Sequence, residues 1–131
     1  MRIMIVGVDI GGTKTLLAVF AENGKLLKEV RFETSQNYQE FLNDLEHHAR
    51  QLETSKAKAI CAAIPGLLNR SAGTALSFGN LAWQPSAIKR DLYQALSNKN
   101  LYIENDSKLA GIAEARYVLQ TYKQVFYLTL S

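Results

Sequence analysis

The sequence is short of cysteine, of long apolar runs and of net charge, and each shortage excludes a class of protein. A single cysteine, Cys61, leaves no disulfide framework within the chain, which fits a reducing cytoplasm. No apolar run reaches the length that spans a membrane. A net charge of +3 is too small to indicate nucleic acid or a membrane surface as a partner. We therefore expect a cytoplasmic protein without either partner.

Apolar residues, in contrast, are plentiful, and their spacing predicts the elements of an α/β fold. They make up 47% of the 131 residues, which is enough for one domain with a core. Apolar runs predict strands, and apolar residues three and four apart predict helices. The strands expected on this basis are 3–8, 16–20, 25–32, 58–64, 101–104 and 125–130, and the first helix is 38–53.

Two further helices are expected between the later strands. Pro85 suits the first position of a helix that runs to about Ser97. A third helix follows residue 107, with Leu109, Ile112, Ala113 and Tyr117 facing inward. The segment 67–81 fits either a long loop or a short hairpin.

The order of these elements predicts a mixed sheet. Three consecutive strands open the chain and imply an antiparallel section, whereas the later strands alternate with helices and imply parallel neighbours with right-handed crossovers. Helices then cover the faces of the sheet. Because the chain ends on the apolar run 125–130, where a domain rarely stops, we expect it to be a piece of a longer protein.

The stretch from Asp9 to Thr15 is the strongest candidate for ligand contact. Gly11 and Gly12 join two predicted strands, and without a Cβ their backbone can approach a ligand closely. Exposed N–H groups in such a turn suit phosphate oxygens. Thr13 adds a hydroxyl and Lys14 a charge, while Asp9 could hold Mg²⁺ through water. The alternative is a plain hairpin in which the glycines serve only the turn.

Two more strand ends carry residues that bind ligands. Gly66 follows the strand 58–64, and Asn105 with Asp106 follows the strand 101–104. In such sheets ligands collect at the carboxyl ends of strands. Asp106 has two interpretations, a catalytic residue or the N-cap of the next helix, and Asn80 is either a ligand contact or a turn residue.

Taken in order, these segments resemble the ROK family of sugar kinases, within the actin, Hsp70 and hexokinase superfamily. The resemblance covers the whole chain, although Ser107 stands where alanine is common and a Pro-Gly pair before Trp83 is missing. It implies a ribonuclease H-like, actin-type ATPase fold and an N-terminal domain whose partner domain is absent. The segments that carry it are 9–14, 63–66, 80–83, 103–106, 109–115 and 127–131.

The resemblance also implies an activity and its residues. The expected reaction transfers phosphate from ATP to a hexose hydroxyl, with glucose as the leading substrate and N-acetylglucosamine, N-acetylmannosamine, mannose, fructose and allose as competitors. Asp106 is then the base that takes the hydroxyl proton. The expected sugar contacts are Gly66, Asn80, Asn105 and Asp106, the phosphate contacts are Gly11, Gly12, Thr13 and Lys14, and Asp9 faces the hydrated Mg²⁺.

Other implications fall outside the 131 residues. A structural zinc is expected only in the missing C-terminal domain, and the full-length protein is expected to be a homodimer. An alternative of another class is a sugar-sensing ROK regulator without catalysis. Such regulators carry a helix-turn-helix domain ahead of the first strand, and we expect none here because Met1 lies two residues before it. A third alternative is an actin-type assembly protein, which needs no base for a sugar hydroxyl. The pair Asn105-Asp106, which follows Pro65-Gly66 in the chain, argues against it.

Overall fold

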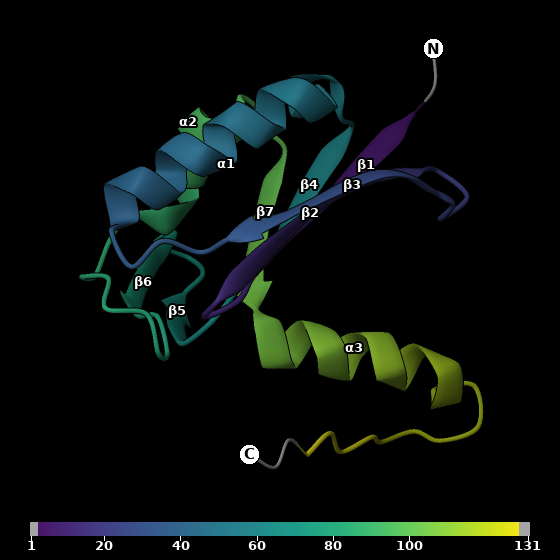
Figure 1. Ribbon diagram of the computed structural model, residues 1–131. Coiled ribbons are helices and arrows are strands. Elements are labelled where there is room, and N and C mark those ends of the chain that lie inside the picture. Colours follow the sequence, from purple (N-terminus) through teal and green to yellow (C-terminus); the bar gives the residue numbers. More distant parts are fainter. Residues whose placement is uncertain (1–2, 129–131) are drawn as a thin grey trace.

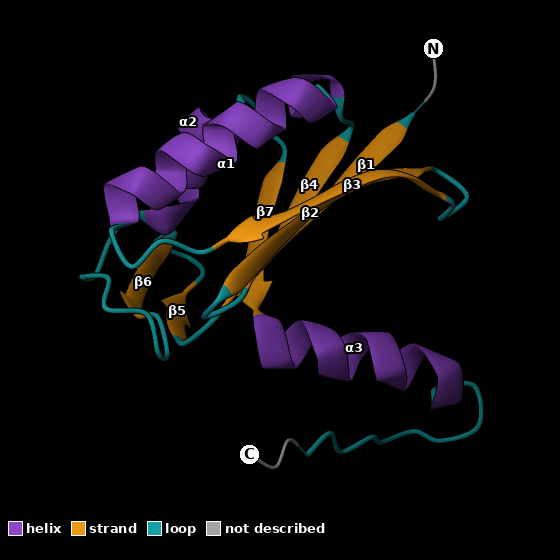
Figure 2. Ribbon diagram, in the orientation of Figure 1, coloured by secondary structure: helices purple, strands orange, loops and turns teal. Residues whose placement is uncertain are grey.

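The centre of the structure is a five-stranded mixed sheet with the strand order β3-β2-β1-β4-β7 (Figures 1 and 2). This computed structural model describes residues 3–128. β1 pairs antiparallel with β2 and parallel with β4, so the sheet changes from one pattern to the other at β1. The predicted mixed sheet is therefore confirmed. The strands are β1 (Met4–Ile10), β2 (Lys14–Ala21), β3 (Leu26–Glu33), β4 (Ala59–Ile64) and β7 (Leu101–Asn105).

Helices lie on both faces of this sheet, as Figure 2 shows. α1 (Tyr38–Leu52) and α2 (Ile88–Leu96) lie side by side on one face, and α3 (Asp106–Val118) leaves the end of β7 on the other side. A short 3₁₀ helix, η1 (Thr54–Lys56), follows α1. The segment left open between loop and hairpin contains a hairpin, β5 (Leu67–Asn69) and β6 (Thr74–Ser77).

The core fills the space between the sheet and the helices α1 and α2. Side chains of successive strand residues point to opposite faces, so Val6, Val8 and Ile10 of β1 are buried while Asp9 between them is exposed. From the helices, Phe41 and other apolar residues three and four apart complete the core. Burying each of the larger of these side chains stabilises the fold by about 1.5–3 kcal/mol. The helix residues in this core are Phe41, Leu45, Ala49, Ile88, Leu92 and Leu96.

The end of the chain differs from the expectation. α3 has no buried residue, and two of the side chains expected to face inward, Ile112 and Tyr117, are 52% and 84% exposed. The helix contacts the sheet at β7 and β4. In the described structure, no further layer packs against the apolar side chains of α3, so they stay exposed or half-buried. Residues 125–128 form no strand and run beside α3, and 129–130 lie outside the described residues.

Pro85 does not begin a helix either, because α2 starts at Ile88. The intervening Ser86 pairs instead with Ala75 at the edge of the small hairpin, through backbone hydrogen bonds of 2.9 and 3.1 Å. Pro85 therefore lies in the segment before α2, next to the bridge residue Ser86.

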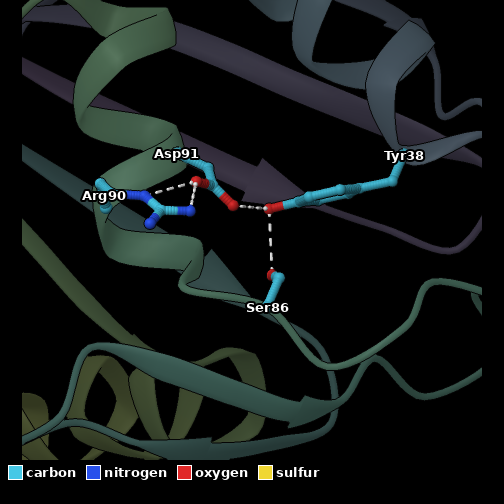
Figure 3. A network of polar contacts seen from close by, with 4 residues as sticks. All are labelled: Tyr38, Ser86, Arg90 and Asp91. Atoms are coloured by element: carbon cyan, nitrogen blue, oxygen red, sulfur yellow. Dashed lines mark hydrogen bonds and ion pairs between the residues drawn. The ribbon is translucent and has the colours of Figure 1, made fainter.

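A polar network holds α1 against α2 (Figure 3). The hydroxyl of Tyr38, at the start of α1, donates to Asp91 Oδ2 on α2 at 2.9 Å and accepts from Ser86 Oγ at 3.1 Å. Arg90 donates twice to the other oxygen of Asp91, at 3.0 and 3.1 Å. Burial raises the pKa of Tyr38 well above its ordinary value, and the neighbouring carboxylate of Asp91 adds to the rise.

This network predicts a weakening of the fold at high pH. Because the pKa of Tyr38 is higher in the folded state, the unfolded state loses this proton first, so the free energy of unfolding falls as pH rises above 10. Tyr38→Phe should cost about 1 kcal/mol at neutral pH through the lost hydrogen bonds and should flatten the decline above pH 10. Urea unfolding at pH 7, 9 and 10.5 measures both effects. An equally steep decline in the variant would contradict this role of Tyr38.

Candidate active site

The topology brings the three predicted ligand-binding segments to one edge of the sheet. β1, β4 and β7 run parallel, so their carboxyl ends meet there. Neighbouring strands lie about 4.8 Å apart, which puts the end of β7 about 10 Å from the end of β1, with β4 between them. The turn at 11–13, the pair Pro65–Gly66 and the pair Asn105–Asp106 therefore share one rim (Figure 1).

The glycine turn between β1 and β2 gives its two glycines different roles. The amide of Gly11 donates to Lys14 O at 3.0 Å and closes the turn, and a Cβ on Gly11 would lie 2.6 Å from that oxygen. Gly12 has room for a side chain, because a Cβ built there would meet only Asn80 Cβ, at 3.9 Å. Neither glycine has a positive φ. The backbone at Gly12 is therefore open to a ligand, and Thr13 and Lys14 beside it are exposed.

The loop that carries Asn80 lies against both the glycine turn and Gly66. Gly66 has a φ of +89°, and a Cβ there would lie 2.3 Å from Ser77 O and 2.8 Å from Gly79 N. Only glycine fits this position, because the space and the left-handed backbone both exclude a side chain. Together with the approach of Asn80 to Gly12, this packing brings three predicted site residues into one cluster.

Aromatic packing holds the Asn80 loop in place. Trp83 is only 6% exposed, with its ring centroid 4.5 Å from that of Phe41 and 5.1 Å from that of Phe78. Its indole N–H donates to Ser35 O at 3.0 Å. Gln36 adds a second tie, because its Oε1 accepts the amide of Ala82 at 3.2 Å. Trp83 is therefore a packing residue of the loop and leaves little surface for a ligand.

The side chain of Asn105 connects two of the strand ends. Its Nδ2 donates to Gly66 O at 2.7 Å, and its Oδ1 accepts the amide of Lys108 at 3.2 Å, which makes Asn105 the N-cap of α3. The interpretation of Asp106 as that cap is therefore wrong. An amide has two donors and two acceptor sites, so Asn105 keeps one of each for a ligand.

Asp106 is the first residue of α3 and is half-buried at the rim. Its Oδ1 accepts the amide of Ser107 at 2.7 Å. Within residues 3–128, Oδ2 has no hydrogen-bond partner. One carboxylate oxygen is thus held by the backbone and the other is free to accept a proton or a hydroxyl.

Glu104 is a part of this site to which the sequence interpretation gave no role. It is 8% exposed, its Oε1 accepts the amide of Asn105 at 2.9 Å, and its Oε2 accepts from Arg70 Nη1 at 2.7 Å. A glutamate in an apolar strand directly before Asn-Asp is the signal that points to it. Burial raises the pKa of the nearby Cys61 thiol, and the charge of Glu104 adds to the rise.

Asp9 lies in the same register row as Ala63 and Glu104 and is exposed. Within the described residues, no three His, Cys, Asp or Glu side chains gather as a direct metal cage. One exposed carboxylate beside a glycine turn nevertheless fits Mg²⁺, which keeps several waters and takes one or two carboxylates.

Among residues 3–128, none of the helices has the length and apolar character needed to cross a membrane.

Comparison with known proteins identifies the class. The model of the ROK family matches residues 5–131, and the chain belongs to this family. A curated relative, the N-acetyl-D-glucosamine kinase of Haemophilus influenzae (strain 86-028NP), is 33% identical over 116 residues. That alignment covers 86% of this chain and 38% of the relative, so the chain spans well under half of the relative's length.

Solved structures of ROK family proteins share the fold of this chain. A ROK family glucokinase from Streptomyces griseus, in complex with glucose and AMPPNP, has a TM-score of 0.74 at 23% identity, over 87% of this chain and 36% of that one. A ROK family transcriptional regulator, a homologue of the E. coli MLC protein, has a TM-score of 0.76 at 16% identity, over 89% and 31%. At these identities the likeness shows the fold.

The two glycines of the turn should differ in their tolerance of a side chain. Gly11→Ala should lower the free energy of unfolding by about 1–3 kcal/mol, because the new Cβ lies 2.6 Å from Lys14 O. Gly12→Ala, the matched control, should change it by less than about 0.5 kcal/mol. Urea denaturation of both variants compares them directly. Equal losses at the two positions would refute the difference.

Proposed function

We propose that this chain supplies the sugar-binding and phosphate-facing half of an ATP-dependent sugar kinase. The observation that carries this proposal is the meeting of Gly12, Asn80 and Gly66 at the rim that also holds Asn105 and Asp106. A turn suited to phosphate and a carboxylate with a free oxygen are what phosphoryl transfer to a hydroxyl requires. The kinase named among the curated relatives supports the same reaction class.

Asp106 has the role of general base in this proposal. A sugar hydroxyl is a poor nucleophile, and a carboxylate within hydrogen-bond reach can take its proton as the new bond to phosphorus forms. The free Oδ2 is the accepting atom, while the bond from the Ser107 amide to Oδ1 limits rotation of the carboxylate. The capping role of Asn105 keeps α3, and with it Asp106, in place.

The sugar is held by groups that both donate and accept. Asn105 retains one N–H and one lone pair after its bonds to Gly66 and Lys108, and sugar hydroxyls can use both. Asn80 offers a second amide from the loop above Gly12. The backbone of Gly66 is the third contact, and its positive φ turns the chain there.

The phosphates of ATP face the glycine turn. Backbone N–H groups at the open Gly12 and the hydroxyl of Thr13 donate to phosphate oxygens, and Lys14 contributes positive charge. Asp9 would hold Mg²⁺ through water, and the ion, when bound, would neutralise charge on the phosphates. The protein's own contribution to such a reaction is positioning and electrostatic stabilisation. Gly11 closes the turn through its bond to Lys14 O, and Gly12, Thr13 and Lys14 face the phosphates.

The substrate is an N-acetylhexosamine or a hexose. The curated relative is an N-acetyl-D-glucosamine kinase, which favours N-acetylglucosamine, and glucose is the main competitor. ADP release by a complete protein that contains this chain, measured with N-acetylglucosamine, glucose, N-acetylmannosamine, mannose and fructose, ranks them. Sugar binding without ADP release for every sugar would favour the sugar-sensing regulator and overturn the kinase proposal.

The proposal places the remaining nucleotide and sugar contacts, and any structural zinc, in a second domain, and it makes the complete protein a cytoplasmic homodimer. We accordingly expect the 131-residue chain alone to show no measurable turnover, because it spans 38% of the length of its curated relative. The same ADP assay, with the complete protein as positive control, tests this. Turnover by the isolated chain would refute the need for a second domain.

Asp106→Asn separates catalysis from folding. The amide cannot accept the proton, so kcat of the complete protein should fall by roughly two to four orders of magnitude. Because Asn105 caps α3, Asp106→Asn and Asp106→Ala should both melt within a few degrees of the unchanged protein. Asp44→Asn, an exposed carboxylate on α1, is the matched control and should leave kcat unchanged. Near-normal kcat in a folded Asp106→Asn protein would mean that the base lies elsewhere.

A further inference from the structure

A hollow of about 480 Å³ lies beside the edge strand β7 and away from the glycine turn. Its walls come from the turn between β5 and β6, from the beginning of α2 and from the start of β7. It shares no residue with the proposed sugar and phosphate contacts. Its volume falls in the range of small-molecule sites.

The lining of this hollow is strongly basic. Arg70, Lys89, Arg90 and Lys99 all line it, and no carboxylate does. Arg70 pairs with Glu104 and Arg90 with Asp91, and both acids are nearly buried, with side chains 11% and 12% exposed. Lys89 and Lys99 are exposed and have no ion-pair partner among residues 3–128. Two positive charges at the hollow are therefore uncompensated.

The start of α2 adds to the positive potential. Ala87 occupies the N-cap position, where its side chain makes no capping hydrogen bond, and it lines the hollow. The first N–H groups of a helix have no partner within the helix and form the positive end of its dipole. One of them, the amide of Lys89, is taken by Gly73 O at 3.1 Å.

Tyr93 gives the hollow one aromatic wall. It stands one helical turn after Lys89 on α2 and is 37% exposed. A tyrosine ring offers apolar surface with a polar tip, which suits the face of a sugar or another ring. The hollow thus combines a site for negative charge with a surface for a ring.

We infer that this hollow binds a small organic phosphate, with the phosphate group among Lys89, Lys99 and the two arginines and the ring against Tyr93. The inference does not depend on the proposed kinase reaction. It rests on the uncompensated lysines, the absence of acids in the lining and the start of α2, which has no side-chain cap.

Isothermal titration calorimetry of the 131-residue chain in 50 mM NaCl tests this, with glucose 6-phosphate, inorganic phosphate and glucose as probes. Glucose 6-phosphate should bind more tightly than inorganic phosphate, and glucose should not bind at this site. The double variant Lys89→Gln/Lys99→Gln should weaken binding of glucose 6-phosphate by about tenfold or more, because two charges near the phosphate are lost. Circular dichroism confirms that the variant is folded.

One matched control makes the result specific. Lys25→Gln/Lys28→Gln removes the same charge from exposed lysines at the far end of the sheet. This variant should not change the affinity by more than about twofold. Equal loss in both double variants, or no binding of glucose 6-phosphate, would overturn the site. Equal affinity for inorganic phosphate would overturn its assignment to an organic phosphate.

Discussion

The amide of Asn105 is the interaction on which the geometry of the rim depends. Its two hydrogen bonds join the end of β4, at Gly66 O, to the first turn of α3, at Lys108 N. Removing the bond to Gly66 O would leave a half-buried carbonyl without a partner, which costs about 1–3 kcal/mol. Removing the bond to Lys108 N would remove the N-cap of α3, which costs about 1 kcal/mol. The direction in which α3 leaves the sheet, and hence the position of Asp106, follows from this one side chain. That is why the residue next to the proposed base matters for structure.

Most of the sheet could be predicted from the sequence, because its physical causes are local. The alternation of Val6, Val8 and Ile10 with exposed neighbours is a consequence of strand geometry, and the spacing of Phe41, Leu45 and Ala49 follows from the helical period. Periodicity does not show, however, whether another layer covers the face that it marks. α3 has apolar residues at helical spacing and buries none of them in the described structure, so its inward face was predicted wrongly.

The sequence predicted which segments form the candidate site, but not which role each residue has within it. The glycines, the Pro-Gly pair and the Asn-Asp pair stand at strand ends, and parallel pairing had to bring those ends together. The roles of neighbouring residues were harder to predict. Gly11 and not Gly12 closes the turn, and Asn105 and not Asp106 caps α3. Each choice depends on where the turn or helix begins to within one residue, which the residue types alone do not determine. The position of Asn80 near the glycine turn is a long-range packing result, and the aromatic cluster around Trp83 holds the loop that carries it.

Arg70 links this rim to the basic hollow beside β7. Glu104 is almost buried, and a buried carboxylate is stable as an anion only with a cation or hydrogen bonds close by. Arg70 supplies the cation from the end of β5, so the β5–β6 turn must lie against β7. The same turn then meets the start of α2, where Gly73 O accepts the amide of Lys89. The ion pair between Arg70 and Glu104, beside the proposed active site, thus also places one wall of the basic hollow.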